Sequence, residues 1–422
     1  MTAADGRPRT FAGAVGIEGN RIRLVTEDAA AAEAFRAAHP DARVFDCRGK
    51  LLMPGLVNTH CHAAMTLQRS YADDIPLMEW LNDYIWPFEA RQTADDAALG
   101  MTLGIVEMLL GGVTSFVDMY YHEDRCVDVV RQLGIRAMLG CNYFDSNVEE
   151  ALPVVERALR RAEGCDRVRI AVAPHAPYTV SPDNLLRGKE LCDRCGLHLT
   201  THIAETRDEA RFVRERYGRT PVAHLDALGL LTERTIGAHC IHLSDEDIEI
   251  LRERGVYVSH NPQSNMKIAS GVAPVAKLLG CGVPVTVATD GPCSNNDLDM
   301  WDEMRTAAFL QKSATGDPCM LPAYEVLEMA TVNGAAALGY AGELGVIAEG
   351  ALADVIVVDL QKPHLQPVHD VVSNLVYCGK ASDVETVVVD GRVVVEERRI
   401  AGVDLPQLYA DAAAAVKRIG GR

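Results

Sequence analysis

The sequence predicts an α/β fold: a (β/α)₈ barrel of the TIM type with a small β-sandwich formed from both chain termini. Three observations support this fold class. Apolar runs alternate with helix-period segments after residue 54, short β-like segments occupy both ends of the chain, and 422 residues are too many for a single small core. We therefore expect residues 1–53 to form the first part of the sandwich, residues 54–343 the barrel, and residues 344–422 the second part of the sandwich with a C-terminal helix.

The composition is that of an ordinary soluble globular protein, with 48% apolar and 24% charged residues. The formal net charge of −18 argues against nucleic acids and anionic membrane surfaces as partners, because both would repel the chain. No apolar run is long enough to span a membrane. Residues 1–10 contain arginines but no apolar signal core, so we expect a cytoplasmic protein.

The twelve cysteines are scattered along the chain, and several lie in apolar runs, which is typical of reduced, buried thiols. Cys192 and Cys195 form the one Cys-x-x-Cys pattern. Because no second pair accompanies it, the pattern favours a structural role over a zinc or redox role.

Short strands separated by turns are expected at both ends of the chain. The N-terminal strands cover residues 14–19, 21–25 and 43–45, with a helix over residues 29–38. The C-terminal strands cover residues 353–359, 384–390 and 392–395, with a helix over residues 404–419. Asp390-Gly391 is a tight-turn signal between the last two strands.

Eight apolar runs between these ends are expected to be parallel strands, because amphipathic helical segments separate them, most clearly residues 96–110. The runs cover residues 55–60, 114–119, 136–143, 169–174, 198–202, 235–239, 257–260 and 284–289. Eight such strands can close as a barrel. The alternative is a doubly wound sheet, but no Gly-x-Gly-x-x-Gly pattern follows any of these strands.

Residues 54–62 are typical of a buried strand that ends in a metal site. Side chains alternate along a strand, so His60 and His62 are expected on one face and Cys61 on the other. Two imidazoles on one face can bind one divalent ion. A His-x-His pattern alone is weak evidence, so partners elsewhere in the chain decide the matter.

Residues with chemically active side chains lie at the ends of the predicted barrel strands, where barrel enzymes have their catalytic residues. Five of the 13 histidines fall at predicted strand ends, more than chance placement gives. These ends hold His60, His62, His175, His202, Glu205, His239 and Asp290.

His60, His62, His202 and Asp290 supply three nitrogens and a carboxylate, a ligand set that suits one metal ion. Each residue taken singly is more often a buried structural residue, but the four together are better explained as one site. A two-metal barrel would need a bridging group, often a carboxylated lysine, at the fourth strand end, where this sequence has His175. We expect one divalent metal ion. Zn²⁺ is the first expectation for its identity, although Fe²⁺ or Mn²⁺ would accept the same ligands.

Water on such an ion becomes a nucleophile near neutral pH, and its proton needs a base. Glu205, three residues after His202, is well placed to shuttle a proton; the alternative is a solvated loop carboxylate. His239 could hold the attacking oxygen or stabilise a tetrahedral intermediate. Residues 65–67 and residues 80–86 either wall an apolar pocket or pack the first helix on the barrel.

These motifs resemble the amidohydrolase superfamily, whose fold is a (β/α)₈ barrel beside a split β-sandwich. Within it, the sequence is similar to the 5′-methylthioadenosine/S-adenosylhomocysteine deaminase family over nearly all of residues 14–400. Related aminohydrolases of triazines and guanine share several of the motifs. The stretches that carry the resemblance are residues 54–69, 116–120, 259–267 and 289–300.

The resemblance implies hydrolytic loss of ammonia from C6 of an adenine nucleoside, such as S-adenosylhomocysteine, 5′-methylthioadenosine or adenosine, giving the inosine analogue. His60, His62, His202 and Asp290 match the family's metal ligands. By the same resemblance, Asp290 takes a proton from the attacking water, Glu205 protonates the ring nitrogen and His239 steadies the hydroxide. Glu89 matches a residue that holds the ribose hydroxyls, and His175 one that binds the substrate.

One departure concerns the substrate tail. Some family members place arginines just after the third strand, facing the substrate, whereas residues 141–147 contain none. S-adenosylhomocysteine, which has a charged homocysteine tail, is therefore a less expected substrate than methylthioadenosine or adenosine.

Two other functions are alternatives. An aminohydrolase of guanine, an oxidised purine, a pterin or a triazine would act on a ring with no ribose for Glu89 to hold. A catalytically dead barrel would serve assembly or binding, but such relatives lose metal ligands that this chain keeps. The partners we expect are a small-molecule nucleoside and further copies of the chain in a homo-oligomer, with no nucleic acid and no membrane.

Overall fold

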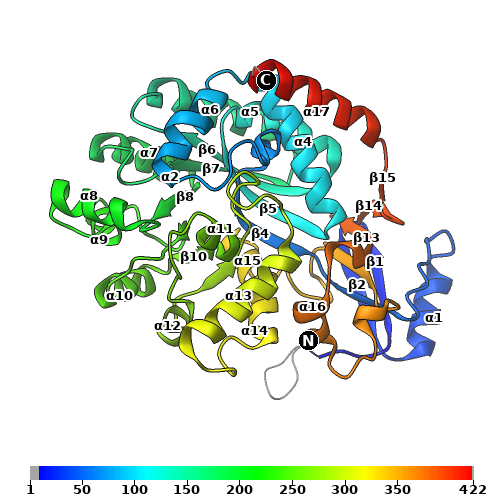
Figure 1. Ribbon diagram of the computed structural model, residues 1–422. Coiled ribbons are helices and arrows are strands. Elements are labelled where there is room, and N and C mark those ends of the chain that lie inside the picture. The colour runs from blue at the N-terminus through cyan, green and yellow to red at the C-terminus, as the bar shows by residue number, and fades with distance from the viewer. Residues whose placement is uncertain (1–8, 421–422) are drawn as a thin grey trace.

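Eight parallel strands form the centre of the protein, and helices surround them (Figure 1). The computed structural model describes residues 9–420, so residues 1–8 and 421–422 of the expected terminal segments, including most of the N-terminal stretch weighed as a signal, lie outside the described residues. Each strand pairs with its sequence neighbours, as expected for a barrel rather than a doubly wound sheet. The strands are β4 (Leu56–Cys61), β5 (Val113–Tyr120), β6 (Arg136–Tyr143), β7 (Val168–Pro174), β8 (His198–Ile203), β9 (Thr235–His239), β10 (Tyr257–His260) and β11 (Val285–Val287).

The first and last barrel strands, β4 and β11, close the barrel through side chains and a short bridge. The Asn58 amide nitrogen donates to Thr289 Oγ1 at 2.8 Å. The backbone N–H of Asp290 donates to the carbonyl oxygen of His60 at 3.0 Å, and Cys61 and Asp290 form an isolated parallel bridge. The two strands therefore meet at the end that carries the histidines.

The helices of the barrel begin and end at local sequence signals. Thr93 and Asp96 form a capping box at the start of α4, in which each side chain accepts the other residue's backbone N–H. Gly196 and Gly218 end α7 and α8 in the left-handed region, with φ of 65° and 70°. The helices are α4 (Ala94–Leu110), α5 (Glu123–Leu133), α6 (Val148–Ala162), α7 (Pro182–Cys195), α8 (Arg207–Tyr217), α9 (Pro221–Ala227), α10 (Asp245–Arg254), α11 (Pro262–Lys267), α12 (Val275–Gly280), α13 (Met300–Thr315), α14 (Ala323–Met329) and α15 (Val332–Ala337).

The segment between β4 and α4 crosses the mouth of the barrel. It contains a short 3₁₀ helix (Ala63–Gln68), α2 (Leu77–Trp80), a π-helical turn (Leu81–Ile85) and α3 (Trp86–Glu89).

Both chain termini build the smaller β-sandwich. A hairpin of β1 (Ala14–Glu18) and β2 (Arg21–Thr26) packs on a five-stranded sheet in the order β15-β14-β13-β12-β3. In that sheet, β3 pairs antiparallel with β12, so an N-terminal strand lies beside C-terminal ones. The strands of the sheet are β3 (Lys50–Pro54), β12 (Val355–Asp359), β13 (Val384–Val389), β14 (Arg392–Glu396) and β15 (Arg399–Ile400).

Three further helices belong to the terminal segments. α1 (Ala29–Ala38) packs on the β1–β2 hairpin, whereas α16 (Val371–Cys378) packs on the barrel helices α13 and α14, and α17 (Leu405–Gly420) lies along α4 (Figure 1). The domain boundaries after residues 53 and 343 stay a prediction.

One predicted strand is wrong. Residues 43–45 form no strand, and Val44 is 69% exposed. Lys50–Pro54 pairs with the edge of β12 instead, and Met53 in this strand lies in the core. A short β-branched run without a neighbouring strand gains neither ladder hydrogen bonds nor buried area.

A buried ion pair joins the barrel to the sandwich. Arg136, at the start of β6, is 1% exposed and donates from Nε to Asp354 Oδ2 at 2.9 Å and from Nη2 to Asp354 Oδ1 at 3.1 Å. The backbone N–H of Asp390 also donates to Asp354 Oδ1, at 2.8 Å. This contact lies at the end of the barrel opposite the histidines.

All twelve cysteines are free; Cys192 is buried and Cys195 exposed, both on α7. Within residues 9–420, none of the helices is both long enough and apolar enough to cross a membrane.

Candidate metal centre and active site

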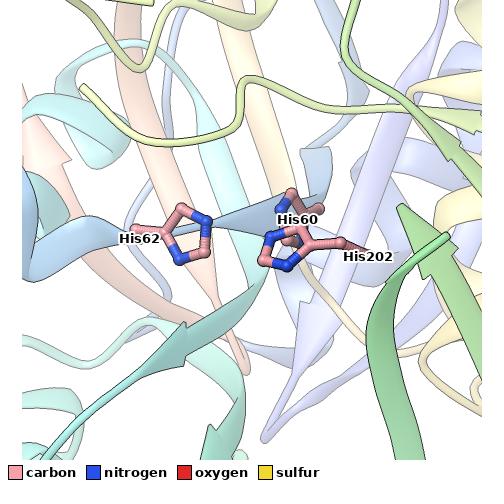
Figure 2. A group of neighbouring side chains, drawn as sticks. All are labelled: His60, His62 and His202. Atoms are coloured by element: carbon pink, nitrogen blue, oxygen red, sulfur yellow. The ribbon is translucent and has the colours of Figure 1, made fainter. Parts of the chain in front are cut away.

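Three histidines converge at the C-terminal ends of strands that lie far apart in the sequence (Figure 2). His60 ends β4, His62 follows it, and His202 lies near the end of β8. Their ring centroids are 4.9 to 5.5 Å apart. Asp290, just after β11, places Oδ1 at 3.4 Å from His60 Nε2 and 3.1 Å from His62 Nε2. The candidate ligand atoms of His60, His62 and His202 lie within 4.8 Å of one another, and so do those of His60, His239 and Asp290. We call the four predicted ligands, His60, His62, His202 and Asp290, the metal-binding group.

Backbone carbonyls orient two of these imidazoles. His62 Nδ1 donates to the Met119 oxygen at 2.6 Å, and His202 Nδ1 donates to the His175 oxygen at 2.8 Å. A carbonyl oxygen can only accept, so a proton lies on each Nδ1, and Nε2 is the nitrogen that can bind a cation.

The state of His60 fits a metal ligand. Its side chain is fully buried, and neither ring nitrogen makes a hydrogen bond within residues 9–420. Burial lowers the pKa of His60 to about 4, so the ring is neutral and keeps a lone pair at physiological pH. A buried, neutral and unpartnered imidazole among nitrogen and oxygen donors suits a divalent ion.

The strand ends around the site are held in an uncommon backbone conformation. Ala204, His239 and Asp290 have φ of 51°, 71° and 61°, in the left-handed region that few non-glycine residues adopt. Such residues cluster at functional sites, where the surrounding structure holds them. Here they follow or end β8, β9 and β11, where the chain turns sharply at the barrel mouth.

Glu205 and His239 lie together beside the metal-binding group. Glu205 Oε2 is 4.0 Å from His239 Nε2, and His239 is 1% exposed. Burial raises the pKa of the Glu205 carboxyl above its ordinary value, so this group holds a proton to higher pH than a surface glutamate. Glu209 fixes the loop by accepting the backbone N–H groups of Ala204 and Glu205, both at 2.8 Å.

Glu89 and His175 line the same cavity from other sides. Glu89 ends α3 and lines the cavity beside Tyr120 and Tyr121, and burial raises its pKa to about 7. His175 stacks on Phe144 with ring centroids 4.3 Å apart.

Two adjoining cavities open at the mouth. The smaller, of about 80 Å³, touches the metal-binding group, Glu205, His239, Met65 and Trp80. The larger, of about 670 Å³, lies between α3 and α6. Both are lined by Trp86, Glu89, Tyr120, Tyr121, Asn142 and Phe144. Met65 and the 80–86 segment therefore form part of the cavity wall, whereas Thr66 and Leu67 line neither cavity. The two spaces can hold different parts of one ligand.

Sequence reasoning missed the residues that support this group. Ser264 Oγ lies 2.6 Å from Asp290 Oδ2, and Asn265 Oδ1 accepts from His239 Nδ1 at 2.8 Å. Both belong to the stretch 259–267, whose side chains the sequence alone did not place. The only sequence signal for these two residues was that they lie in one of the motifs that carry the family resemblance.

Comparison with known proteins gives consistent matches over most of the chain. The model of the Amidohydrolase family matches residues 51–394. The chain is 46% identical over 410 residues to the 5-methylthioadenosine/S-adenosylhomocysteine deaminase of Syntrophobacter fumaroxidans, covering 96% of this chain and 92% of that one. It is 45% identical over 391 residues to the 5′-deoxyadenosine deaminase of Methanothermobacter thermautotrophicus, covering 91% and 90%.

A solved structure shares the whole architecture. The crystal structure of an adenosine deaminase from Xanthomonas campestris with bound zinc superposes with a TM-score of 0.91 at 37% identity, covering 97% of this chain and 94% of that one.

Proposed function

Because this chain belongs to the amidohydrolase family and is a hydrolytic deaminase, we propose that it removes the 6-amino group of adenine nucleosides. The substrates are 5′-methylthioadenosine, S-adenosylhomocysteine and adenosine, and the products are the inosine analogue and ammonia. The observation that carries the proposal is the convergence of Glu205 and His239 on the metal-binding group, with Glu89 on the wall of the same cavity.

One zinc ion per chain is the proposed cofactor, held by His60, His62, His202 and Asp290. The donor set of three imidazoles and one carboxylate supports zinc, although Fe²⁺ and Mn²⁺ accept the same atoms. The bound ion supplies Lewis acidity, which makes water a nucleophile near neutral pH.

The chain's own groups then move the protons. Asp290 accepts a proton from the attacking water and gives it to the amino group, which leaves as ammonia when the C6–N bond breaks. The Nε2 atom of His239 accepts a hydrogen bond from the attacking oxygen, and the hydroxyl proton left on that oxygen returns to Glu205 as the C6 carbonyl forms. Glu205 protonates the ring nitrogen next to C6, because its raised pKa keeps a proton available. Glu89 accepts hydrogen bonds from the ribose hydroxyls, which orients the purine toward the metal-binding group.

The larger cavity supports a preference for an uncharged 5′ substituent. Its wall contains Arg157, but this guanidinium already donates from Nε to Asp124 Oδ2 at 2.7 Å. Glu150, Ala151 and Val154 complete the same side of the cavity. A homocysteine carboxylate would therefore meet a cation that is already paired, so we propose that 5′-methylthioadenosine is preferred over S-adenosylhomocysteine.

The test is an ultraviolet absorbance assay of the purified protein on the three nucleosides, with guanine as a base that lacks ribose. We expect turnover of the nucleosides only, with kcat/KM higher for 5′-methylthioadenosine than for S-adenosylhomocysteine. Dialysis against a chelator abolishes activity, and added zinc restores it. Absence of ammonia release from all three nucleosides, with metal content confirmed, would remove the proposal.

Location and assembly are part of the same proposal. We propose a cytoplasmic enzyme, where such nucleosides arise, and a homo-oligomer in solution. Light scattering after size-exclusion chromatography measures the mass of the assembly, and a monomer would contradict the second statement.

A further inference from the structure

The short helix α11 lies directly against the catalytic residues, and two of its polar side chains are fully buried. Ser264 and Asn265 are adjacent in sequence, and each hydrogen-bonds one residue of the proposed proton-transfer machinery. Neither side chain lines the cavity that contains the metal-binding group. Ser264 Oγ and Asn265 Oδ1 are therefore directed at protein residues and not at a ligand.

Asn265 determines which nitrogen of His239 carries the proton. Its Oδ1 lies 2.8 Å from His239 Nδ1, and only the nitrogen can donate in this pair. The proton therefore lies on Nδ1, and the Nε2 lone pair faces Glu205 and the metal-binding group. Among the described residues, the Asn265 amide nitrogen has no hydrogen-bond partner, so accepting from His239 is the main polar contact of this amide.

A second amide competes for the same imidazole. Asn261 Nδ2 lies 3.3 Å from His239 Nδ1, and a donor there favours the opposite tautomer, with the proton on Nε2. The contact to Asn265 is shorter, so it prevails. Removal of the Asn265 acceptor should let Asn261 donate to Nδ1 and move the proton to Nε2.

Ser264 gives the two carboxylate oxygens of Asp290 different hydrogen-bond partners. Its hydroxyl donates to Oδ2 at 2.6 Å, and Ser294 Oγ lies 3.1 Å from the same oxygen. Oδ1, in contrast, faces His60 Nε2 and His62 Nε2. The Ser264 hydroxyl thereby fixes the carboxylate rotamer that presents Oδ1 to the metal-binding group.

We propose that Ser264 and Asn265 are positioning residues of the deaminase, Ser264 for the Asp290 carboxylate and Asn265 for the His239 tautomer. The catalytic consequence depends on the proposed function, whereas the tautomer and the metal affinity can be measured without it.

The first experiment uses ¹⁵N NMR of histidine-labelled, metal-free protein, with the His239 signals assigned by their loss in His239→Gln. In the wild type we expect His239 protonated on Nδ1; a proton on Nε2 would overturn the proposal for Asn265. In Asn265→Leu we expect the Nε2 tautomer, and in Asn265→Asp, which keeps an acceptor, the Nδ1 tautomer. Because the wild-type measurement needs no variant, a folding failure of Asn265→Leu leaves the proposal testable.

Kinetics on the zinc-loaded protein give the second readout. We expect Asn265→Leu to lower kcat by about 10- to 100-fold with KM within about twofold, and Asn265→Asp to recover most of that loss. Unchanged kcat in Asn265→Leu would contradict the inference. If no nucleoside is turned over by the wild type, the proposed function fails, and the NMR result still decides the tautomer.

Ser264 is tested by zinc affinity, measured in competition with a chromophoric chelator. We expect Ser264→Ala to weaken zinc binding by about 10- to 100-fold. Met266→Ala, on the same helix at a 53% exposed position, is the matched control and should leave affinity and kcat unchanged. Equal affinities for Ser264→Ala and Met266→Ala would overturn the role of Ser264.

Discussion

At the residue scale, Glu205 is the group whose protonation the proposed reaction needs most. Glu205→Gln keeps the shape but cannot give up a proton, so we predict a loss in kcat of about 10²- to 10⁴-fold. Zinc content, measured by mass spectrometry, should stay the same because Glu205 is outside the metal-binding group. Glu215→Gln, at an exposed position of α8, is the control. A Glu205→Gln variant with near wild-type kcat would assign the proton transfer to another residue.

The charge of Glu89 gives a pH-dependent prediction. Its pKa is raised to about 7 by burial, so the carboxyl is neutral below that pH and anionic above it. Ribose hydroxyls donate hydrogen bonds, and an anionic oxygen accepts them more strongly. KM for 5′-methylthioadenosine should therefore fall as pH rises through about 7.

The Glu89→Gln variant provides the comparison for that profile. It cannot ionise, so its KM should be higher than that of the wild type above pH 7 and should not change through this range. Steady-state kinetics between pH 5.5 and 8.5 measure both proteins. Parallel profiles would show that another group causes the wild-type change.

The sequence was sufficient to predict the candidate site residues that lie at strand ends. His60, His62, His202 and Asp290 could be placed together because barrel strands end on one face whatever the details of packing. Ser264 and Asn265 could not be assigned, because their partners lie 26 residues away and the contacts depend on how α11 packs against β9 and β11. A hydrogen bond of this kind follows from the final geometry and leaves no periodic pattern.

At the element scale, the packing of α4 against the 3₁₀ helix after His62 depends on glycine. A Cβ atom at Gly100 would lie 2.2 Å from the backbone oxygen of Ala64. Backbone cannot move aside as a side chain can, so we predict that Gly100→Ala lowers the free energy of unfolding by about 1–3 kcal/mol. It should also weaken zinc binding, since Ala64 follows His62 by two residues.

A second glycine provides the control for Gly100→Ala. Nothing lies within 4 Å of a Cβ atom built at Gly280, at the end of α12. Gly280→Ala should therefore be neutral or slightly stabilising, because alanine has the higher helix propensity. Urea unfolding measures both variants, and equal midpoints would refute the steric argument.

Elements with strong local signals were predictable. The helix over residues 29–38 and the strands over residues 136–143, 235–239 and 257–260 have the bounds that the sequence indicates. Residues 43–45 and Lys50–Pro54 show the limit, because the predicted strand has no partner, whereas Lys50–Pro54, without a β-branched residue, pairs with β12. Pairing between residues about 300 positions apart cannot be derived from either segment alone.

At the scale of the whole molecule, the Arg136–Asp354 pair ties the barrel to the sandwich. Removal of one partner leaves a buried charge without compensation, so Arg136→Met should lower the free energy of unfolding by about 3–5 kcal/mol. Arg125→Met breaks the exposed pair with Asp95 and should leave the urea midpoint unchanged. A small effect of Arg136→Met would mean that this ion pair contributes little to holding the two parts together.

The sandwich built from both termini was predictable because its segments are β-rich and lie at opposite ends of the chain. What the sequence could not show is the way they join: β3 pairs with β12, and the β1–β2 hairpin lies on top. The expected homo-oligomer stays a prediction.

The closure between β4 and β11 has a consequence for biosynthesis. His60 and His62 emerge from the ribosome early, whereas Asp290 emerges only after more than half of the chain has followed them. A nascent or truncated polypeptide that ends before β11 has the three imidazoles but lacks the Asp290 carboxylate, which is the fourth candidate ligand. The complete set of four candidate ligands therefore exists only once the last barrel strand has docked beside the first, so only a chain with a closed barrel presents the whole site.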